Sequence, residues 1–182
     1  MQNSVQNESE QSSNISYKRV GALITDYVAY YIIYVIMIIA FYTSKFGGVP
    51  EVSADVLANN VFSNVIQTPE FSITFLGVVL IWEIVIPLIN NGQSISKKIF
   101  KIKVNTLNKN KAGLIFRGIV KIIILNPYGV IAYLIGSYIN SAYINTISNI
   151  LSLVFIISVV MFLKNKSSLH DKIGKTFVSE AI

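Results

Sequence analysis

The chain of 182 residues contains no cysteine and a single histidine, His170. The absence of thiols excludes disulfide bonds, thiol catalysis and thiolate metal sites, and one imidazole cannot build a multi-histidine metal site. Charge is also scarce, because charged residues make up 13% of the chain where a soluble domain carries about 25%. We therefore expect an integral membrane protein without a metal or other cofactor.

Long apolar runs account for the composition. Hydrophobic residues make up 53% of the chain, and the mean hydropathy is +0.58. A membrane span needs about 20 mostly apolar residues, and four segments approach that length: 22–42, 71–89, 119–138 and 147–163. We predict an all-α membrane protein, a bundle of four transmembrane helices. For the third segment, which holds Lys121 and Pro127, an interfacial helix followed by a re-entrant stretch is the alternative.

The first 14 residues, MQNSVQNESEQSSN, are polar and contain neither lysine nor arginine. Their composition predicts a disordered tail, because they offer little apolar surface to bury. A cleaved secretory signal would begin with a basic region and end at a small-residue cleavage site. Here the basic pair Lys18 and Arg19 directly precedes a full-length span. We expect residues 15–182 to form one transmembrane domain whose first helix is not cleaved.

The distribution of lysine and arginine predicts the topology. Positive charge near span ends marks the cytoplasmic side of the cell membrane. Basic residues cluster before the first span, between the second and third, and after the fourth, whereas the first connector holds only Lys45. Four spans put these clusters on one side, with both termini in the cytoplasm, whereas three spans would carry the last cluster across. The sequence thus favours a multi-pass protein of the cell membrane.

The two long connectors differ in character. The first has valines at helical spacing (Val52, Val56, Val61 and Val65), which predicts an amphipathic helix on the outer surface. The second reads NNGQSISKKIFKIKVNTLNKNKAG, and its alternating KIFKIKV run predicts a short strand and a turn. The lysines of this basic connector suit the anionic cytoplasmic leaflet of the bilayer, and we expect no nucleic-acid partner.

Two acidic residues, Asp26 and Glu83, lie inside the apolar runs. A carboxylate near the centre of a span costs about 2.5–3.5 kcal/mol, so such residues usually face the bundle interior and mark a functional site. Each can bind a proton or a cation, or it can serve assembly as an interhelical hydrogen-bond donor or as the partner of a base. Pro87 frees the backbone carbonyl of Glu83, which can then face a cavity.

Three segments, YKRVGALITDYV, NNGQSISKKIFKIKV and SSLHDKIGKTFV, resemble the RDD family of bacterial membrane proteins, which is named for one arginine and two aspartates. The resemblance covers residues 17–178 and matches the arginine to Arg19, the first aspartate to Asp26 and the second to Asp171. The other motif positions fall on Gly92, Gln93, Ser94, Lys97, Leu169 and His170. This chain departs from the family pattern with Ser94 in place of threonine and Ser96 where glycine is usual.

The motif residues suggest specific roles. Arg19 and Asp26 are seven positions apart, so they project from one helical face with Asp26 about 10 Å deeper. Arg19 can clasp the first helix to the C-terminal segment by pairing with Asp171, or it can act as an anchor that reaches the headgroups. His170 and Asp171 are adjacent, but no nucleophile has a recognisable setting, so we expect helix capping and no enzyme.

The resemblance implies a transport-associated protein, since the family is thought of in those terms with its ligands largely unknown. We expect Asp26 and Glu83 to carry a monovalent cation, a proton or another small ligand. The alternative is a non-transporting accessory, assembly or immunity-type subunit of a larger membrane complex. A homo-oligomer suits either function, because one four-helix bundle leaves little room for a pathway.

Overall fold

The computed structural model describes residues 2–48, 65–66, 68–107, 111–165 and 167–181. These residues are largely helical, as predicted, and include two short strands. In chain order the elements are α1 (Gln2–Phe46), α3 (Pro69–Leu80), the π-helical turn η2 (Ile81–Val85), α4 (Ile86–Ile89), α5 (Ile95–Ile99), β1 (Ile102–Thr106), α6 (Ala112–Leu125), the 3-10 turn η3 (Pro127–Gly129), α7 (Val130–Ile139), the 3-10 turn η4 (Ser141–Tyr143), α8 (Ile144–Asn165), α9 (Leu169–Ile173) and β2 (Thr176–Glu180).

Three helical stretches of the described residues are long and apolar enough to cross a membrane: Ile15–Phe46, Pro69–Ile89 and Ser141–Lys164. They contain the first, second and fourth segments expected from the sequence. The third expected segment is not one straight helix, because α6 and α7 meet at an angle of 76°. The described chain therefore has three candidate spans, or four if the bent pair counts as one.

The bend between α6 and α7 follows from two adjacent residues. Asn126 ends α6 in the left-handed backbone region, with φ of 38°, and Pro127 has no N–H to continue the helix. The Asn126 side chain then begins α7, because its Oδ1 accepts hydrogen bonds from the backbone N–H groups of Ile131 (3.0 Å) and Ala132 (3.2 Å). The asparagine thus ends one helix and caps the next.

The N-terminal segment differs from the expectation. The helix α1 begins at Gln2 and so includes residues 2–14, for which composition predicts a disordered tail. This stretch contains no glycine or proline, the two residues that most strongly interrupt a helix. Of the predicted outer amphipathic helix, Val52, Val56 and Val61 lie outside the described residues, whereas Val65 is buried in the core.

The apolar core is rich in aromatic side chains. Tyr34 of α1 stacks on Tyr128 of η3 with ring centroids 4.7 Å apart, and it meets Phe71 and Phe75 of α3 edge to face. Such pairs add to the free energy gained from burial, by about 0.5–1.5 kcal/mol each. This core holds α1 and α3 against the break between α6 and α7.

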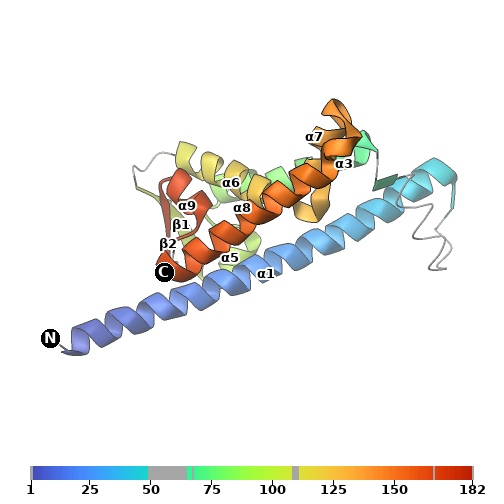
Figure 1. Cartoon of the computed structure of the whole chain (residues 1–182). Coiled ribbons are helices and arrows are strands. Elements are labelled where there is room, and N and C mark those ends of the chain that lie inside the picture. The colour runs from blue at the N-terminus through green and yellow to red at the C-terminus, as the bar shows by residue number, and fades with distance from the viewer. Residues whose placement is uncertain (1, 49–64, 67, 108–110, 166, 182) are drawn as a thin grey trace.

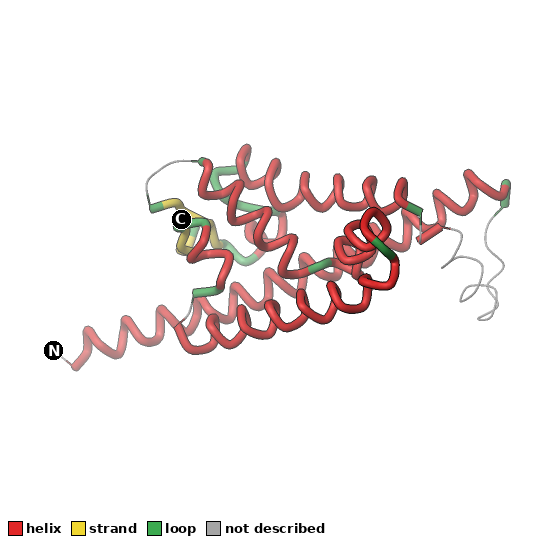
Figure 2. Tube along the Cα trace, turned by 45° about the horizontal axis from the view of Figure 1, so that its top comes forward, coloured by secondary structure: helices red, strands yellow, loops and turns green. Residues whose placement is uncertain are grey.

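The two strands close the other end of the bundle. β1 and β2 pair antiparallel, with Ile102 opposite Glu180 and Thr106 opposite Thr176. Only the last three residues of the KIFKIKV run lie in β1, because the run begins in α5 and in the turn that follows it. Figure 1 shows α9, β1 and β2 together at one end, past which the N-terminal part of α1 projects, with α3 and α7 toward the opposite end. Figure 2 shows the sheet as a small cap on a bundle of helices. We call this the sheet end.

Gly92 and Gln93 attach β1 to the turn that follows α4. Gly92 has φ of 87°, and a Cβ at this position would overlap the carbonyl oxygen of Val104. Its own carbonyl accepts a hydrogen bond from the Val104 N–H at 3.1 Å, and the Gln93 side chain donates to the carbonyl of Ile102 at 3.0 Å. Both motif residues therefore have a structural task, and only glycine fits at position 92.

Candidate functional site

Buried charged side chains form two clusters that α1 and α6 share. The inner cluster consists of Asp26, Glu83 and Lys121. The rim cluster, which is nearer the sheet end, consists of Arg19, Arg117 and Asp171. In each cluster α1 and α6 contribute one residue apiece, and the third residue comes from η2 or α9.

In the inner cluster one ammonium group joins two carboxylates. Lys121 Nζ lies 3.1 Å from Asp26 Oδ2 and also forms an ion pair with Glu83 Oε1. All three residues are at most 3% exposed. The structure thus brings together the two intramembrane acids that the sequence singles out, around a lysine that it does not. Removal of this lysine would leave two buried carboxylates without their shared partner.

A glycine lets α6 approach the acid-bearing helix. A Cβ at Gly118 would lie 3.1 Å from the backbone carbonyl oxygen of Glu83. This carbonyl therefore faces α6. Glu83 itself lies in the π-helical turn η2, a local feature that is frequent at functional sites.

The two acids differ in how their oxygens are satisfied. Asp26 Oδ1 accepts hydrogen bonds from the Trp82 indole at 2.8 Å and the Ser96 hydroxyl at 2.5 Å, while Oδ2 faces Lys121. Glu83 Oε1 accepts from both the Tyr30 hydroxyl and Lys121. Glu83 Oε2 is buried without a hydrogen-bond partner among the described residues. A buried acceptor of this kind is costly, and it offers a place for a proton.

A chain of hydrogen bonds runs from Asp26 to Lys97. The Ser96 hydroxyl, which donates to Asp26, lies 3.0 Å from the Ser94 hydroxyl, and Lys97 Nζ donates to Ser94 Oγ at 3.0 Å. Ser96 occupies a helical position in α5, so serine in place of glycine causes no strain there. Burial, and then the charge of Lys121, lower the pKa of Lys97 to about 8. We call this chain the relay.

In the rim cluster the stoichiometry is reversed, because two guanidinium groups share one carboxylate. Arg117 Nε donates to Asp171 Oδ1 at 2.9 Å, and Arg19 forms an ion pair with Asp171 Oδ2. Burial alone would raise the pKa of the Asp171 carboxyl, but Arg117 and Arg19 hold it well below its usual range. The Arg19 guanidinium also lies 4.7 Å from the centre of the Phe162 ring. The cluster thereby joins α1, α6, α8 and α9.

Ser168, His170 and Asp171 form the N-terminal cap of α9. The Ser168 hydroxyl donates to Asp171 Oδ2 at 2.6 Å, and His170 Nε2 lies 2.9 Å from the same hydroxyl oxygen. Burial and the nearby charge of Arg117 lower the pKa of His170 well below its usual value, so the imidazole is neutral at pH 7. Because the serine hydrogen is already donated, Nε2 must carry the imidazole proton. In this tautomer Nε2 donates to the Ser168 oxygen and accepts no proton from it.

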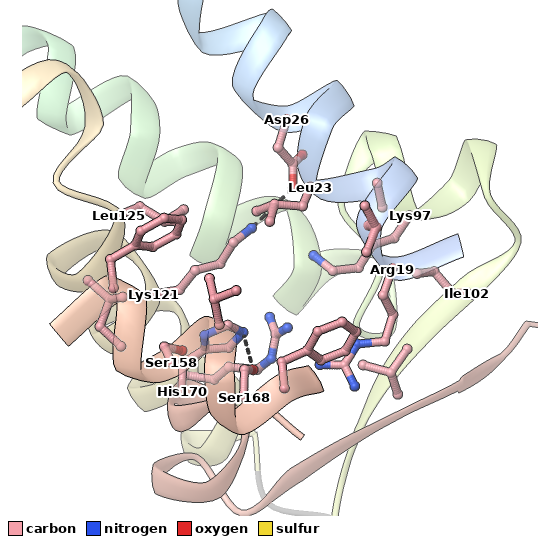
Figure 3. Close-up of a pocket in the computed structure, with 18 of the residues that line it drawn as sticks. Arg19, Leu23, Asp26, Lys97, Ile102, Lys121, Leu125, Ser158, Ser168 and His170 are labelled. Carbon is pink, nitrogen blue, oxygen red and sulfur yellow. Dashed lines mark hydrogen bonds and ion pairs between the residues drawn. The ribbon is translucent and has the colours of Figure 1, made fainter. Parts of the chain in front are cut away.

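A cavity of about 260 Å³ lies beside both clusters. Its charged lining consists of Arg19, Asp26, Lys97, Arg117 and Lys121. Figure 3 shows Lys121 extending toward Asp26, while Lys97 enters from the opposite side of the cavity and His170 lies below them with Ser168. Both the inner cluster and the outer end of the relay are therefore in contact with one open space.

Sequence reasoning missed Arg117 and Lys121 as members of the site. Their signal is present in the run AGLIFRGIVKIIIL, where two basic residues four positions apart share one face of an apolar helix. A pair of bases in one apolar segment is the natural complement of single acids in two others. Trp82, in the second span, is a further member of the site, because its indole donates a hydrogen bond to Asp26.

Comparison with known proteins agrees with the motifs. The profile of the RDD family matches residues 16–175, a range that includes both clusters and the relay. The chain matches no curated protein and no solved structure. The family match covers most of the sequence, and the apolar helices give the multi-pass membrane architecture expected of it. The chain belongs to the RDD family.

Proposed function

We propose that this protein crosses the cell membrane four times, with both termini on the cytoplasmic side, and that it is a transport-associated protein in which the inner cluster and the relay carry protons. The topology decides from which side of the membrane the cavity opens, and the contacts of the two acids support the movement of protons.

Contacts between distant segments support an even number of crossings. β1 and β2 pair with each other, and Arg19 pairs with Asp171, so each pair lies on one side of the membrane. The three straight candidate spans alone would put Arg19 and Asp171 on opposite sides. A crossing by the bent pair α6 and α7 removes this conflict, and it favours four spans over the re-entrant alternative.

The basic residues support the orientation. Several lysines lie in or next to α9, β1 and β2 at the sheet end, namely Lys98, Lys101, Lys103, Lys172 and Lys175. By the positive-inside rule this end is cytoplasmic. A single cysteine tests both points, because the native chain has none. A cysteine at Ser141 should react with an impermeant maleimide from outside intact cells, whereas one at Lys101 should not. The reverse pattern, or equal labelling, would contradict the topology.

The observation that carries the functional proposal is the continuous path of hydrogen bonds from Lys97 through Ser94 and Ser96 to Asp26. Each hydroxyl in the path can donate and accept. Lys121 links Asp26 to Glu83, whose Oε2 has an open position for a proton. Chains of titratable groups inside membranes are the usual routes for protons. The pKa of Lys97, about 8, lets the cavity end of the path exchange protons near neutral pH.

The cavity favours a proton over a metal cation. Four cationic side chains line it, against the single carboxylate of Asp26. A free monovalent cation would meet repulsion in this space, whereas a proton moves along existing hydrogen bonds without entering as an ion. Of the expected ligands, the charge of the cavity lining therefore supports a proton more than a monovalent cation.

Proton movement can be measured in liposomes that contain a pH-sensitive dye, with a membrane potential imposed. Wild-type protein should change the internal pH, while Asp26→Asn and Glu83→Gln should each reduce the rate at least tenfold. Glu70→Gln is the matched control, because Glu70 lies in the same span on an exposed position. Unchanged flux in Asp26→Asn, or no flux in the wild type, would contradict the proposal.

A second candidate is a non-transporting accessory subunit of a larger membrane complex or a homo-oligomer. Its support is α8, where Ile150, Leu153, Ile156 and Val160 are each more than half exposed. This face is open to a second protein or to lipid. A stoichiometric partner that is recovered in mild detergent and lost in both Arg19→Ala and Asp26→Asn would favour this function over transport.

We further propose that the protein is not an enzyme. The support for this is the cap of α9, in which the hydroxyl of Ser168 and the imidazole of His170 serve each other and Asp171. A substitution Ser168→Thr that keeps the hydroxyl should therefore leave the function intact, because the cap is kept.

A further inference from the structure

The cavity beside the two clusters is lined by cationic side chains at one end, and its walls are otherwise apolar. The walls come mainly from α1 and α8, through Leu23, Phe155, Val159 and Phe162. Figure 3 shows Lys97 and Lys121 extending into this space from opposite sides. A binding site with one strongly charged end and an otherwise apolar surface matches a molecule that is itself amphiphilic.

The cavity opens toward the lipid-facing surface. Val20 of α1 and Leu163 of α8 both line it, and they are 42% and 66% exposed. Both residues lie in candidate membrane spans. An apolar chain can therefore leave the cavity between α1 and α8 and continue among the surrounding lipids.

The charge of the site calls for an anion. Arg19, Arg117, Lys97 and Lys121 supply four positive charges, and the nearby carboxylates are those of Asp26, Glu83 and Asp171. His170 is neutral, so these four bases and three carboxylates together carry one net positive charge. Buried charge without a counterion is unfavourable, above all next to a membrane.

Lys97 is where this excess charge lies. Its side chain is 5% exposed, and among the described residues its ammonium makes one hydrogen bond, to Ser94, and no ion pair. By contrast Lys121 and Arg117 each contact a carboxylate directly. An anion in the cavity would give Lys97 the partner that its position lacks.

We propose that the cavity binds the phosphate-bearing headgroup of an anionic membrane lipid, with the phosphate at Lys97 and the acyl chains between α1 and α8. The volume of about 260 Å³ is below the range of about 300–1,000 Å³ that holds a whole drug-sized ligand. It suits a headgroup whose chains remain outside. This inference goes beyond the proposed proton movement and does not depend on it.

The test is lipid retention by the full-length protein, purified in mild detergent, titrated with phosphatidylglycerol or phosphatidylcholine and measured by native mass spectrometry. Wild-type protein should retain one phosphatidylglycerol per chain and little phosphatidylcholine. Lys97→Gln should weaken retention at least tenfold, whereas Lys98→Gln should not, because Lys98 neighbours it on the same short helix but is exposed.

A second pair of variants tests the apolar wall without touching a charge. Val159→Trp should fill the cavity and reduce retention at least tenfold, and Val160→Trp should leave it unchanged because Val160 points outward and does not line the cavity. Equal retention by these two variants, or equal binding of the two lipids, would overturn the proposal. Soluble glycerol phosphate distinguishes the source of the phosphate. If it displaces the lipid at equal concentration, the ligand is a soluble phosphate ester and the lipid assignment is wrong.

Discussion

The inner cluster and the rim cluster contain the same kinds of group in opposite proportions. Two carboxylates share one ammonium in the inner cluster, whereas two guanidiniums share one carboxylate at the rim. Both clusters are buried, and both depend on α1 and α6. The uncompensated charge is therefore negative in the inner cluster, toward the membrane interior, and positive in the rim cluster, toward the sheet end. The cavity lies beside both clusters. In our two proposals Lys97 serves both ligands, because it is the cavity end of the proton relay and also the residue that binds the phosphate.

The strongest way to break the inner cluster is to remove its single cation. Lys121→Met should destabilise the protein by about 3–5 kcal/mol, because two buried carboxylates lose their shared partner. Thermal unfolding in detergent measures the effect. The triple variant with Asp26→Asn and Glu83→Gln is the control, since it removes the charges that Lys121 compensates. If the triple variant is no more stable than Lys121→Met alone, the ion pairs are not the source of the loss.

Removing the single anion of the rim cluster is the counterpart. Asp171→Asn should cost about 3 kcal/mol, since asparagine keeps the helix cap but leaves two buried guanidiniums facing each other. The pKa of Asp171 is lowered in the folded protein. The contribution of Asp171 to folding stability is therefore fully present above the pKa of an unfolded aspartate, 3.8, and is lost as the pH falls below that value. The difference between wild type and variant should thus be constant from pH 5 to 8 and shrink in acid. A constant difference down to pH 3 would contradict this account.

Lys97 lines the same cavity as residues of both clusters, and its contribution to stability should show the opposite pH dependence. The pKa of Lys97 is about 8 in the folded protein and 10.5 in the unfolded chain. As the pH rises, Lys97 therefore loses its proton in the folded state before it does so in the unfolded state, and folding stability increases between these two pKa values. The charged groups that face it are Lys121, Glu83, Arg117 and Asp26. Between about pH 7.5 and 9.5, wild type should gain about 2 kcal/mol relative to Lys97→Gln. Lys98→Gln should follow the wild type over the same range.

The smallest effect is expected from the ion pair outside both clusters. Lys18 pairs with Glu180, and their side chains are 28% and 39% exposed. Exposed pairs contribute little, so Lys18→Gln should change stability by about 0.5 kcal/mol or less. A loss comparable to that of Asp171→Asn would mean that burial is not the reason why the ion pairs of the two clusters stabilise the protein more than this exposed pair.

Much of this arrangement follows from local sequence patterns. Asp26 and Glu83 could be singled out because a carboxylate in an apolar run is expensive. The alternation in KIFKIKV indicates a strand, of which only the last three residues of the run lie in β1, and Pro127 marks a break in the third apolar segment. Each of these signals depends on residues close together in the chain.

The partners of those residues could not be predicted in the same way. Lys121 counts against a membrane span when its segment is considered alone, and its task appears only when α6 packs against α1 and η2. The relay depends on the turn into α5, which puts the hydroxyls of Ser94 and Ser96 3.0 Å apart. The angle of 76° between α6 and α7 likewise depends on Asn126 as well as on Pro127, because the Asn126 side chain bonds to the start of α7.

The indole of Trp82 donates a hydrogen bond to Asp26, and the chain contains no other tryptophan. The tryptophan fluorescence of the protein therefore comes from an indole that is hydrogen-bonded to the Asp26 carboxylate. Protonation of Asp26, or its replacement by asparagine, should shift the emission spectrum without any attached label. The protein thus contains its own optical sensor for the charge state of the inner cluster, readable in detergent, in liposomes and in stopped-flow experiments.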